Sequence, residues 1–306
     1  MTPRRILITG GAGFIGARLA RRLAARGDDV LVLDDLSAAS TPPRGSGRFL
    51  RADVRDPRRV AAATAGRELV VHLASVVGVE AVLADPARTG SVIREGTAVM
   101  LGAALRQGCE VLAFSSSEVT DAPRRGPRAI YAEAKRDAEE LLLRHSGELP
   151  VTIVRPFNVV GPGQSAAQGM VLAALAAAAR RGAPLPVHGD GSQQRGFLHV
   201  DDLVDTLVEL LAQPPGHSGE VLEIGSPQRI AIRELAERVA GAARSRSRPA
   251  PGTPDGRRED AERRVPDLRA LQARVRFAPR RGLRRLLADV TGNVLGDVAG
   301  DATCLA

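Results

Sequence analysis

The amino-acid sequence predicts an α/β protein, a Rossmann-type doubly wound parallel sheet followed by a smaller C-terminal α/β domain. Three observations lead to this fold class. Short apolar runs alternate with helical patterns through the first half of the chain, a glycine-rich turn follows the first apolar run, and the spacing of the elements changes after Pro162. Such alternation is typical of βαβ units, whose strands are parallel.

The first half contains six apolar runs, and several of them end in small or polar residues. We expect strands at residues 5–9, 29–34, 48–54, 69–75, 110–117 and 151–162, the last of which runs into a loop. Amphipathic spacing predicts the helices between them, and Gly27 is expected to close the first helix. These helices are expected at residues 14–27, 91–107 and 128–145.

After Pro162 an alanine-rich run predicts a buried helix at residues 166–182. A strand, a turn, a second strand and a helix are expected across residues 184–213, and a strand–helix pair across 220–244. Residues 244–256 show no periodicity and predict a mobile loop. Two short helices are expected at residues 265–275 and 280–290.

We divide the chain into two domains and a tail. The Rossmann domain is expected to comprise residues 1–158, with residues 189–225 returning to it. The smaller domain is expected to comprise residues 159–188 and 226–292. Residues 293–306 would then form the tail.

Composition indicates an ordinary globular protein, since 44% of the 306 residues are apolar and 25% are charged. The net charge of +8 comes from dispersed arginines, and aromatic residues amount to only 2%, so we expect no nucleic-acid partner. Neither a membrane-spanning run nor a signal-peptide pattern is present. Cys109 and Cys304 suggest no disulfide framework, and no Cys/His cluster suggests a metal. These observations predict a cytoplasmic protein.

The glycine-rich turn predicts a dinucleotide site. Gly11, Gly13 and Gly16 satisfy the spacing G-x-G-x-x-G, and Gly10 adds the spacing G-x-x-G-x-x-G. The turn stands between a predicted strand and a predicted helix, which is the context that this motif requires. Glycines there let the backbone approach a pyrophosphate, whose charge is favoured at the helix N-terminus.

Acidic residues after the next two strands indicate which dinucleotide binds. Asp34 ends the second predicted strand, eighteen residues beyond Gly16, and Asp35 follows it. A carboxylate there accepts hydrogen bonds from the adenosine ribose and repels a 2′-phosphate, so the sequence predicts NAD rather than NADP. Asp53 follows the third predicted strand, where it would either accept a hydrogen bond from the adenine amino group or simply end the strand.

The sole tyrosine, Tyr131, and the sole lysine, Lys135, lie four residues apart in a chain whose other cationic side chains are all arginines. On a helix this spacing places both residues on one face. A lysine ammonium lowers the pKa of a nearby phenol and can donate a hydrogen bond to a nicotinamide ribose. The phenolate then serves as a general base, so the pair predicts proton transfer beside the cofactor.

In chain order, the segments TGGAGFIG, HLAS, FSSSEV, YAEAK, RPFNVVGPG, GDGSQQRGFLHVDD and RREDAERRVPD resemble the extended short-chain dehydrogenase/reductase superfamily. The resemblance runs from about residue 4 to residue 290 and is strongest to nucleotide-sugar epimerases, dehydratases and decarboxylases. It implies NAD as the cofactor and a nucleotide-diphosphate sugar, bound by the smaller domain, as the substrate. It also implies a homodimer formed through helices 91–107 and 128–145.

The resemblance implies catalytic roles for four residues. Tyr131 would remove the proton from a sugar hydroxyl with Lys135 as its partner, and Ser117 would hydrogen-bond the same oxygen. Glu118 stands where dehydratases and decarboxylases place a second acid/base group, although a carboxylate that only packs beside the cofactor fits equally well.

Binding residues follow from the same resemblance. The residues implied to contact NAD are Gly10, Gly13, Phe14, Ile15, Gly16, Asp34, Asp35, Asp53, Val54, Leu73, Ala74, Ser75, Tyr131 and Lys135. The residues implied to contact the substrate are Ser117, Asn158, Arg195 and Arg258, of which the last three would hold its diphosphate.

Two departures from the family pattern bear on the substrate. Tyr131 follows Ser117 by only fourteen residues, where family members have a longer loop that helps to cover the sugar. Ile93 stands where the family often has asparagine. We therefore expect a more open or differently covered catalytic face and an unusual sugar.

The sequence favours a nucleotide-sugar 4-epimerase, in which NAD transiently oxidises the sugar at C4. A 4,6- or 5,6-dehydratase and a UDP-glucuronate decarboxylase are the alternatives, because both begin with the same oxidation. A non-catalytic regulator that binds NAD is a more remote alternative, which the intact set of Ser117, Tyr131 and Lys135 disfavours.

Overall fold

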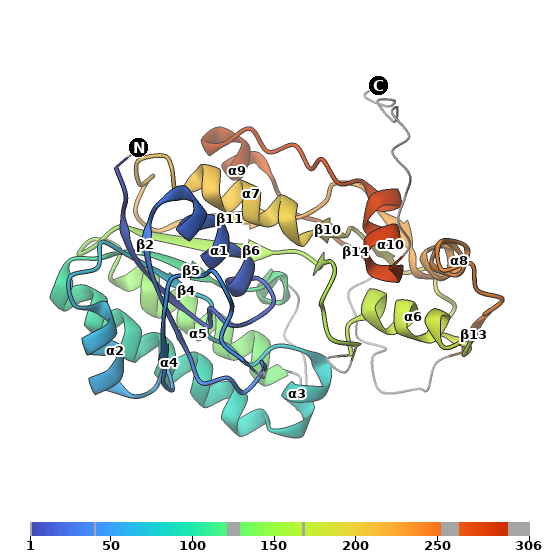
Figure 1. Ribbon diagram of the computed structural model, residues 1–306, viewed down its shortest axis with the longest axis horizontal. Helices are drawn as coiled ribbons and strands as arrows, with labels where there is room; N and C mark the ends of the chain where they lie inside the picture. Colours follow the sequence, from blue (N-terminus) through green and yellow to red (C-terminus); the bar gives the residue numbers. More distant parts are fainter. Residues whose placement is uncertain (1, 40, 121–128, 167–168, 252–262, 293–306) are drawn as a thin grey trace.

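The computed structural model describes residues 2–39, 41–120, 129–166, 169–251 and 263–292, arranged around a seven-stranded sheet (Figure 1). In spatial order the strands are β11 (Glu220–Ile224), β6 (Val151–Pro156), β5 (Glu110–Phe114), β4 (Leu69–His72), β1 (Arg5–Thr9), β2 (Asp29–Asp34) and β3 (Arg48–Arg51). All six pairings between neighbours are parallel. The strand order reverses between β4 and β1, and ligands of doubly wound sheets bind at such a switch point.

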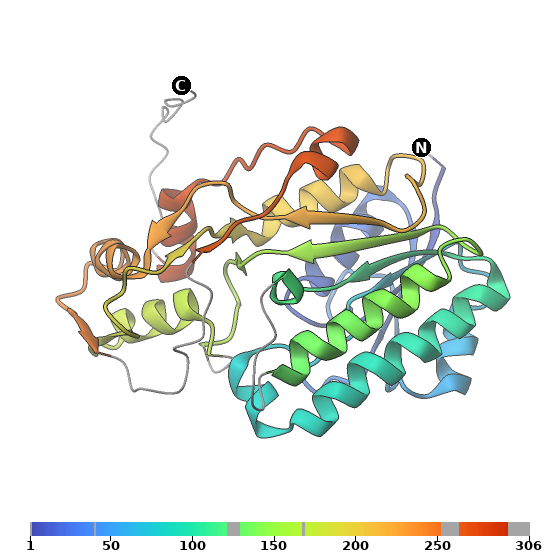
Figure 2. The same ribbon diagram turned by 180° about the vertical axis from the view of Figure 1, so that it is seen from behind.

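Helices cover both faces of this sheet, which explains why its central strands are apolar throughout. On one face lie α1 (Gly16–Arg26), α7 (Val200–Leu210) and α9 (Arg269–Arg274), and on the other lie α2 (Pro57–Thr64), α4 (Pro86–Gln107) and α5 (Ala129–Arg144). Figure 2 shows α4 and α5 side by side along the second face. The consecutive β1 residues Ile6, Leu7 and Ile8 are fully buried, because side chains on both sides of the strand enter a core.

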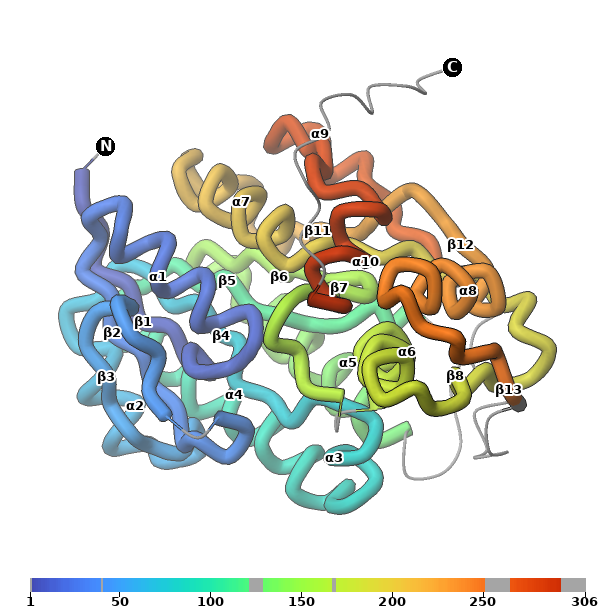
Figure 3. The backbone as a smooth tube through the Cα atoms, turned by 45° about the vertical axis from the view of Figure 1, so that its right-hand side comes forward, coloured from blue at the N-terminus to red at the C-terminus, as the bar shows by residue number. Residues whose placement is uncertain are grey.

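A separate apolar core lies beyond the end of the sheet. It is formed mainly by α6 (Val171–Arg180), α8 (Ile232–Ala242) and α10 (Leu283–Thr291), which gather on one side of the molecule in Figure 3. Short strands accompany these helices. They are β7 (Val159–Val160) with β10 (Leu198–His199), β8 (Leu185–Val187) with β13 (Pro249–Pro251), and β12 (Ile230–Ala231) with β9 (Gln194–Arg195) and β14 (Arg263–Arg264).

The prediction of a loop at residues 244–256 was wrong for residues 249–251, and residues 252–256 lie outside the described residues. Residues 249–251 form strand β13, which runs parallel to β8. The N–H of Leu185 donates a hydrogen bond to the carbonyl of Arg248 at 3.0 Å. A proline-containing segment can join a sheet in this way because its carbonyls still accept hydrogen bonds, even where the ring removes the donor.

Several element boundaries also differ from those predicted. The first helix begins at Gly16 rather than at residue 14, and α4 begins at Pro86 rather than at residue 91. Asp85 caps α4 by accepting a hydrogen bond from the N–H of Arg88 at 2.8 Å. The strand β5 ends at Phe114, and a 3-10 turn, η1 (Ser117–Thr120), follows.

The predicted α/β class with a parallel Rossmann-type sheet is confirmed. No helix in the described ranges is both long and apolar enough to cross a membrane. Nor do the described residues contain a group of three or more His, Cys, Asp or Glu side chains arranged to hold a metal ion.

Candidate active site

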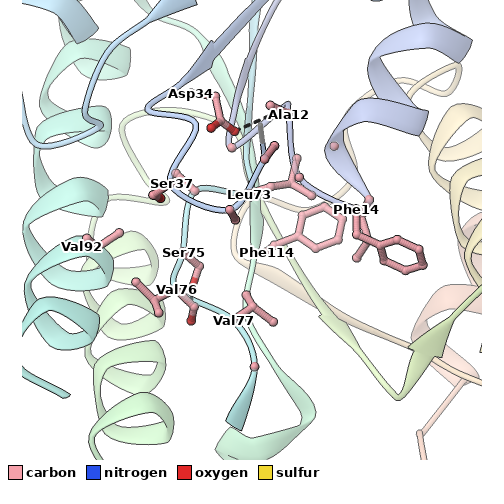
Figure 4. Close-up of a pocket in the computed structure, with 18 of the residues that line it drawn as sticks. Ala12, Phe14, Asp34, Ser37, Leu73, Ser75, Val76, Val77, Val92 and Phe114 are labelled. Carbon is pink, nitrogen blue, oxygen red and sulfur yellow. Dashed lines mark hydrogen bonds between the residues drawn. The ribbon is translucent and has the colours of Figure 1, made fainter. Parts of the chain in front are cut away.

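A cavity of about 540 Å³ opens at the carboxyl edge of the central sheet. Residues that end or follow six of the parallel strands form its walls, together with residues of α1, α4 and α5. Figure 4 shows Asp34 from β2, Leu73 after β4 and Phe114 from β5 around one space. Because parallel strands end together at this edge, residues distant in the sequence meet there.

Most of the predicted site residues line this cavity. They are Gly10, Gly13, Phe14, Ile15, Gly16, Asp34, Asp35, Asp53, Val54, Leu73, Ala74, Ser75, Ser117, Glu118, Tyr131, Lys135 and Asn158. Arg195 does not line the cavity, and Arg258 lies outside the described residues. The fold therefore brings the predicted catalytic and dinucleotide residues together, whereas Arg195 is not among the residues that line their cavity.

The glycine turn packs too closely for side chains. Gly10 has a φ of +70°, and a Cβ there would lie 2.6 Å from the backbone nitrogen of Ala74. A Cβ at Gly16 would collide with the carbonyl oxygen of Gly10. No side chain caps the first turn of α1, and residues of that turn line the cavity. This cradle of backbone N–H groups at a helix N-terminus suits an anionic group such as a pyrophosphate.

Asp34 is tied to the same turn. Its Oδ2 atom accepts a hydrogen bond from the N–H of Ala12 at 2.9 Å, shown dashed in Figure 4, and its Oδ1 atom accepts one from the N–H of Leu36 at 2.8 Å. Burial raises the pKa of this carboxyl, while the two backbone hydrogen bonds oppose that shift. The side chain is thus held in a fixed orientation at the end of β2.

Asp53 has a partner within the protein. Arg55 donates to Asp53 from Nε at 3.0 Å and from Nη2 at 2.6 Å. Its hydrogen bonds with Arg55 lower the pKa of the Asp53 carboxyl. The ion pair with Arg55 supports the interpretation that Asp53 ends the strand as a structural residue. Asp53 nevertheless lines the cavity, where it could also contact adenine.

Tyr131 and Lys135 both face the cavity from α5. The Lys135 Nζ atom donates to the carbonyl of Phe114 at 2.7 Å, and only 5% of the residue is exposed. Burial lowers the pKa of Lys135 to about 8, although Glu139 partly opposes this shift. Tyr131 packs against a small apolar cluster that contains Ile93.

Ser117 and Glu118 begin the turn η1, which follows shortly after the end of β5. Ser117 is buried, and the N–H of Glu118 donates to the Oγ atom of Ser116 at 3.1 Å. Both residues line the cavity with Tyr131. A hydroxyl, a phenol and a carboxylate thus border one space, which is a suitable set for moving protons on a polyhydroxylated substrate.

Asn158 contacts the backbone of Gly196, the residue that follows Arg195. The Asn158 Nδ2 atom donates to the carbonyl of Gly196 at 3.0 Å. Arg195 is buried in β9, and its Nη1 atom donates to the carbonyl of Gln194 at 2.8 Å. Asn158 therefore connects the segment after β6 to the β9 segment as well as lining the cavity.

Sequence reasoning gave no role to His72 and did not consider Arg88. His72 lies at the end of β4, hydrogen-bonded to Thr9 at 2.7 Å and to Thr97 at 3.2 Å. Burial, and secondarily the charge of Lys135, lowers the pKa of His72 to about 3, so the ring is neutral. Arg88 lines the cavity from the first turn of α4, and the dipeptide Asp85-Pro86 is the helix-start signal that would have placed it there.

Comparison with known proteins finds relatives over most of the chain. The profile of the "NAD dependent epimerase/dehydratase family" matches residues 6–225. UDP-glucuronic acid decarboxylase 4 of Arabidopsis thaliana is 31% identical, over 98% of this chain and 71% of that protein.

Solved structures resemble both the fold and its extent. UDP-glucose 4-epimerase of Thermus thermophilus, in complex with NAD, is 27% identical, with a TM-score of 0.81 over 94% of this chain and 98% of that chain. MoeE5, in complex with UDP-glucuronic acid and NAD, is 31% identical, with a TM-score of 0.80 over 93% of this chain and 96% of that chain.

Proposed function

The chain belongs to the NAD-dependent epimerase/dehydratase family, and from this premise we propose that it is a nucleotide-sugar 4-epimerase. In this reaction the sugar is oxidised at C4, turns within the site, and is reduced again from its other face. The observation that carries the proposal is that Ser117, Tyr131 and Lys135 line the same cavity as the glycine turn.

NAD is the cofactor of this family, and the chain's own residues fit it. The glycine turn has no room for side chains, and no side chain caps the start of α1, so this helix N-terminus suits a pyrophosphate. We assign Phe14 and Ile15 to the same group, and Asp34 to the adenosine ribose. When bound, NAD supplies the hydride acceptor and donor for the sugar carbon.

We assign the proton transfers to Tyr131. Its phenolate takes the proton of the C4 hydroxyl during oxidation and returns it during reduction. Lys135, held by the carbonyl of Phe114, places a positive charge near the phenol and favours the phenolate. Ser117 hydrogen-bonds the same sugar oxygen and orients it toward Tyr131.

The remaining assignments are proposals on the same basis. Asn158 is assigned to the substrate diphosphate, with Arg195 and Arg258 as its cationic partners after the substrate binds. The division into a Rossmann domain (1–158 with 189–225) and a substrate domain (159–188 with 226–292) is proposed as well. We further propose that the protein acts in the cytoplasm as a homodimer.

A substrate screen tests the proposed function. The purified protein is incubated with UDP-, GDP- and dTDP-hexoses, and the products are identified by NMR. We expect one of these sugars to be converted into its C4 epimer.

Tyr131→Phe should still bind NAD but lose roughly 10²–10⁴-fold in turnover, the usual contribution of a general acid–base residue. Unchanged turnover in Tyr131→Phe would remove the assigned base, and no turnover of any sugar would favour a non-catalytic role.

A lyase is the second candidate function, because Glu118 lines the cavity beside Ser117 and a decarboxylase is among the relatives. A dehydratase needs a group to remove the C5 proton while the C6 hydroxyl leaves as water. A decarboxylase loses CO₂ from C5 of the oxidised uronic acid, and C5 then gains a solvent proton. A 4-epimerase needs neither step, so in that reaction Glu118 transfers no proton.

Glu118→Gln and solvent deuterium separate the two reaction types. Glutamine preserves shape but cannot titrate, so an epimerase should retain activity within about tenfold, whereas loss of a true acid/base group costs roughly 10²–10⁴-fold. An epimerase also introduces no deuterium at carbon and releases no CO₂. A large loss of activity in Glu118→Gln, together with deuterium at carbon in the product, would show that the protein is a lyase rather than an epimerase.

A further inference from the structure

A pair of opposite charges stands at the Asp34 side of the cavity. The Nη2 atom of Arg88 donates to the Oδ2 atom of Asp35 at 3.1 Å. Asp35 directly follows β2, whereas Arg88 comes from the first turn of α4, and both residues line the cavity. The pair therefore joins the end of β2 to α4 beside the carboxylate assigned to the adenosine ribose.

Arg88 is held more loosely than its cationic neighbour Arg55. Arg55 binds Asp53 through two nitrogens and donates from Nη1 to Ser91 at 2.9 Å. The contact with Asp35 is the one side-chain hydrogen bond recorded for Arg88 within the described residues, and 39% of its side chain is exposed. Its backbone, in contrast, is fixed by the Asp85 cap.

The other cations on the cavity wall are committed elsewhere. Arg18 donates to the carbonyls of Phe14 and Pro162, and Lys135 donates to the carbonyl of Phe114. Among the described wall residues, Arg88 is thus the cation that lies with the acidic residues after β2. The Asp85 cap holds its backbone, and the Asp35 carboxylate holds its guanidinium.

These residues include both a group that favours NAD and a group that favours NADP. A carboxylate after the second strand of a Rossmann fold binds the ribose hydroxyls and repels a 2′-phosphate, whereas a nearby arginine accommodates that phosphate. Here Asp34 is the carboxylate, and Arg88 would be the arginine were it not bound to Asp35. The charge of the arginine is therefore largely neutralised at the place where it could attract NADP.

We propose that Asp35 and Arg88 form a pair that determines cofactor specificity, in which Asp35 withholds from a 2′-phosphate the guanidinium that would otherwise bind it. Arg88 is then a latent phosphate ligand, and NADP is excluded by two carboxylates acting differently. Asp34 repels the 2′-phosphate directly, and Asp35 binds the arginine that would otherwise bind that phosphate. This proposal rests on NAD binding with its adenosine at Asp34.

Calorimetric binding of NAD and NADP to protein freed of co-purifying dinucleotide tests the pair. The variants are wild type, Asp35→Asn, Arg88→Gln and the double variant, with circular dichroism as a check on folding. We expect Asp35→Asn to tighten NADP binding by roughly 10- to 100-fold, the range of one hydrogen bond to a charged group. The double variant should lose this gain, and in all three variants NAD affinity should change much less than NADP affinity.

Two results would overturn the proposal. An unchanged NADP affinity in Asp35→Asn would mean that Arg88 cannot reach the phosphate. An equal gain in Asp35→Asn and in the double variant would mean that only the removal of a negative charge mattered. Failure of the wild type to bind NAD would instead refute the cofactor site itself, so that failure is distinguishable from the other two.

Discussion

Lys135 carries its charge in a buried position, which explains why arginine does not replace it. Its Nζ atom is a compact donor that reaches the carbonyl of Phe114 from inside the protein. A guanidinium is planar and broader and presents five donors, which this site would have to accommodate in the space of one ammonium group. The geometry at position 135 therefore requires lysine, although the chain otherwise uses arginine in place of lysine.

The buried charge of Lys135 should make stability depend on pH. Its pKa is about 8 in the folded protein and 10.5 without burial. Between these pH values the unfolded chain holds a proton that the folded chain has lost, so the free energy of unfolding rises with pH across that window. Below pH 8 both states are protonated, and the full cost of burying the ammonium remains.

Denaturant titrations of Tyr131→Phe and of Tyr131→Phe/Lys135→Met isolate this effect, because neither variant contains the phenol. As the pH rises from 8 to 10.5, the stability of the lysine-containing protein should increase relative to that of its partner. A difference that stays constant over this range would show that Lys135 titrates with an ordinary pKa.

At the scale of elements, α4 and α5 carry both the catalytic face and an outer surface. They pack against each other, and Arg94 of α4 forms an ion pair with Asp137 of α5 at 2.6 Å. Tyr131 faces inward from α5, whereas Ala98 of α4 and Asp137 are exposed. The outer surface is where the family resemblance predicts the homodimer, as a four-helix bundle.

We predict that the protein sediments at twice the chain mass of 32.2 kDa at micromolar concentration. Ala98→Glu adds charge and bulk to the predicted interface and should shift the protein toward the monomer. Arg58→Glu changes an exposed residue of α2, outside that interface, and should leave the dimer intact. A monomeric wild type, or equal dissociation of both variants, would count against the predicted interface.

At the scale of the whole molecule, the cavity depends on strands that are distant in the chain. Segments that follow strands from β1 to β6 meet at one edge, and Asn158 connects the last of them to Gly196 near β9. The second core, around α6, α8 and α10, lies beyond this edge. The protein thus presents a formed dinucleotide cradle next to a separately packed region that is proposed to hold the sugar nucleotide.

Local patterns in the sequence were sufficient for the fold class, the glycine turn and the Tyr131/Lys135 pair. Each depends on residues within one or two elements: strand and helix periodicity, glycines at fixed spacing, and a four-residue separation on one helix. General rules of connection then restrict the parallel strands to a few possible orders. For the same reason, the predicted residues after successive strands line one cavity.

Only the tertiary structure decided features that depend on pairing across the chain. Residues 249–251 lack any strand pattern yet join β8, because a neighbouring backbone offers hydrogen bonds. Arg195 carries the expected charge, but it is buried in β9 and is not among the residues that line the cavity. The Asp35–Arg88 pair unites residues 53 positions apart, and no local signal encodes a contact whose energy depends on where the start of α4 lies relative to the end of β2.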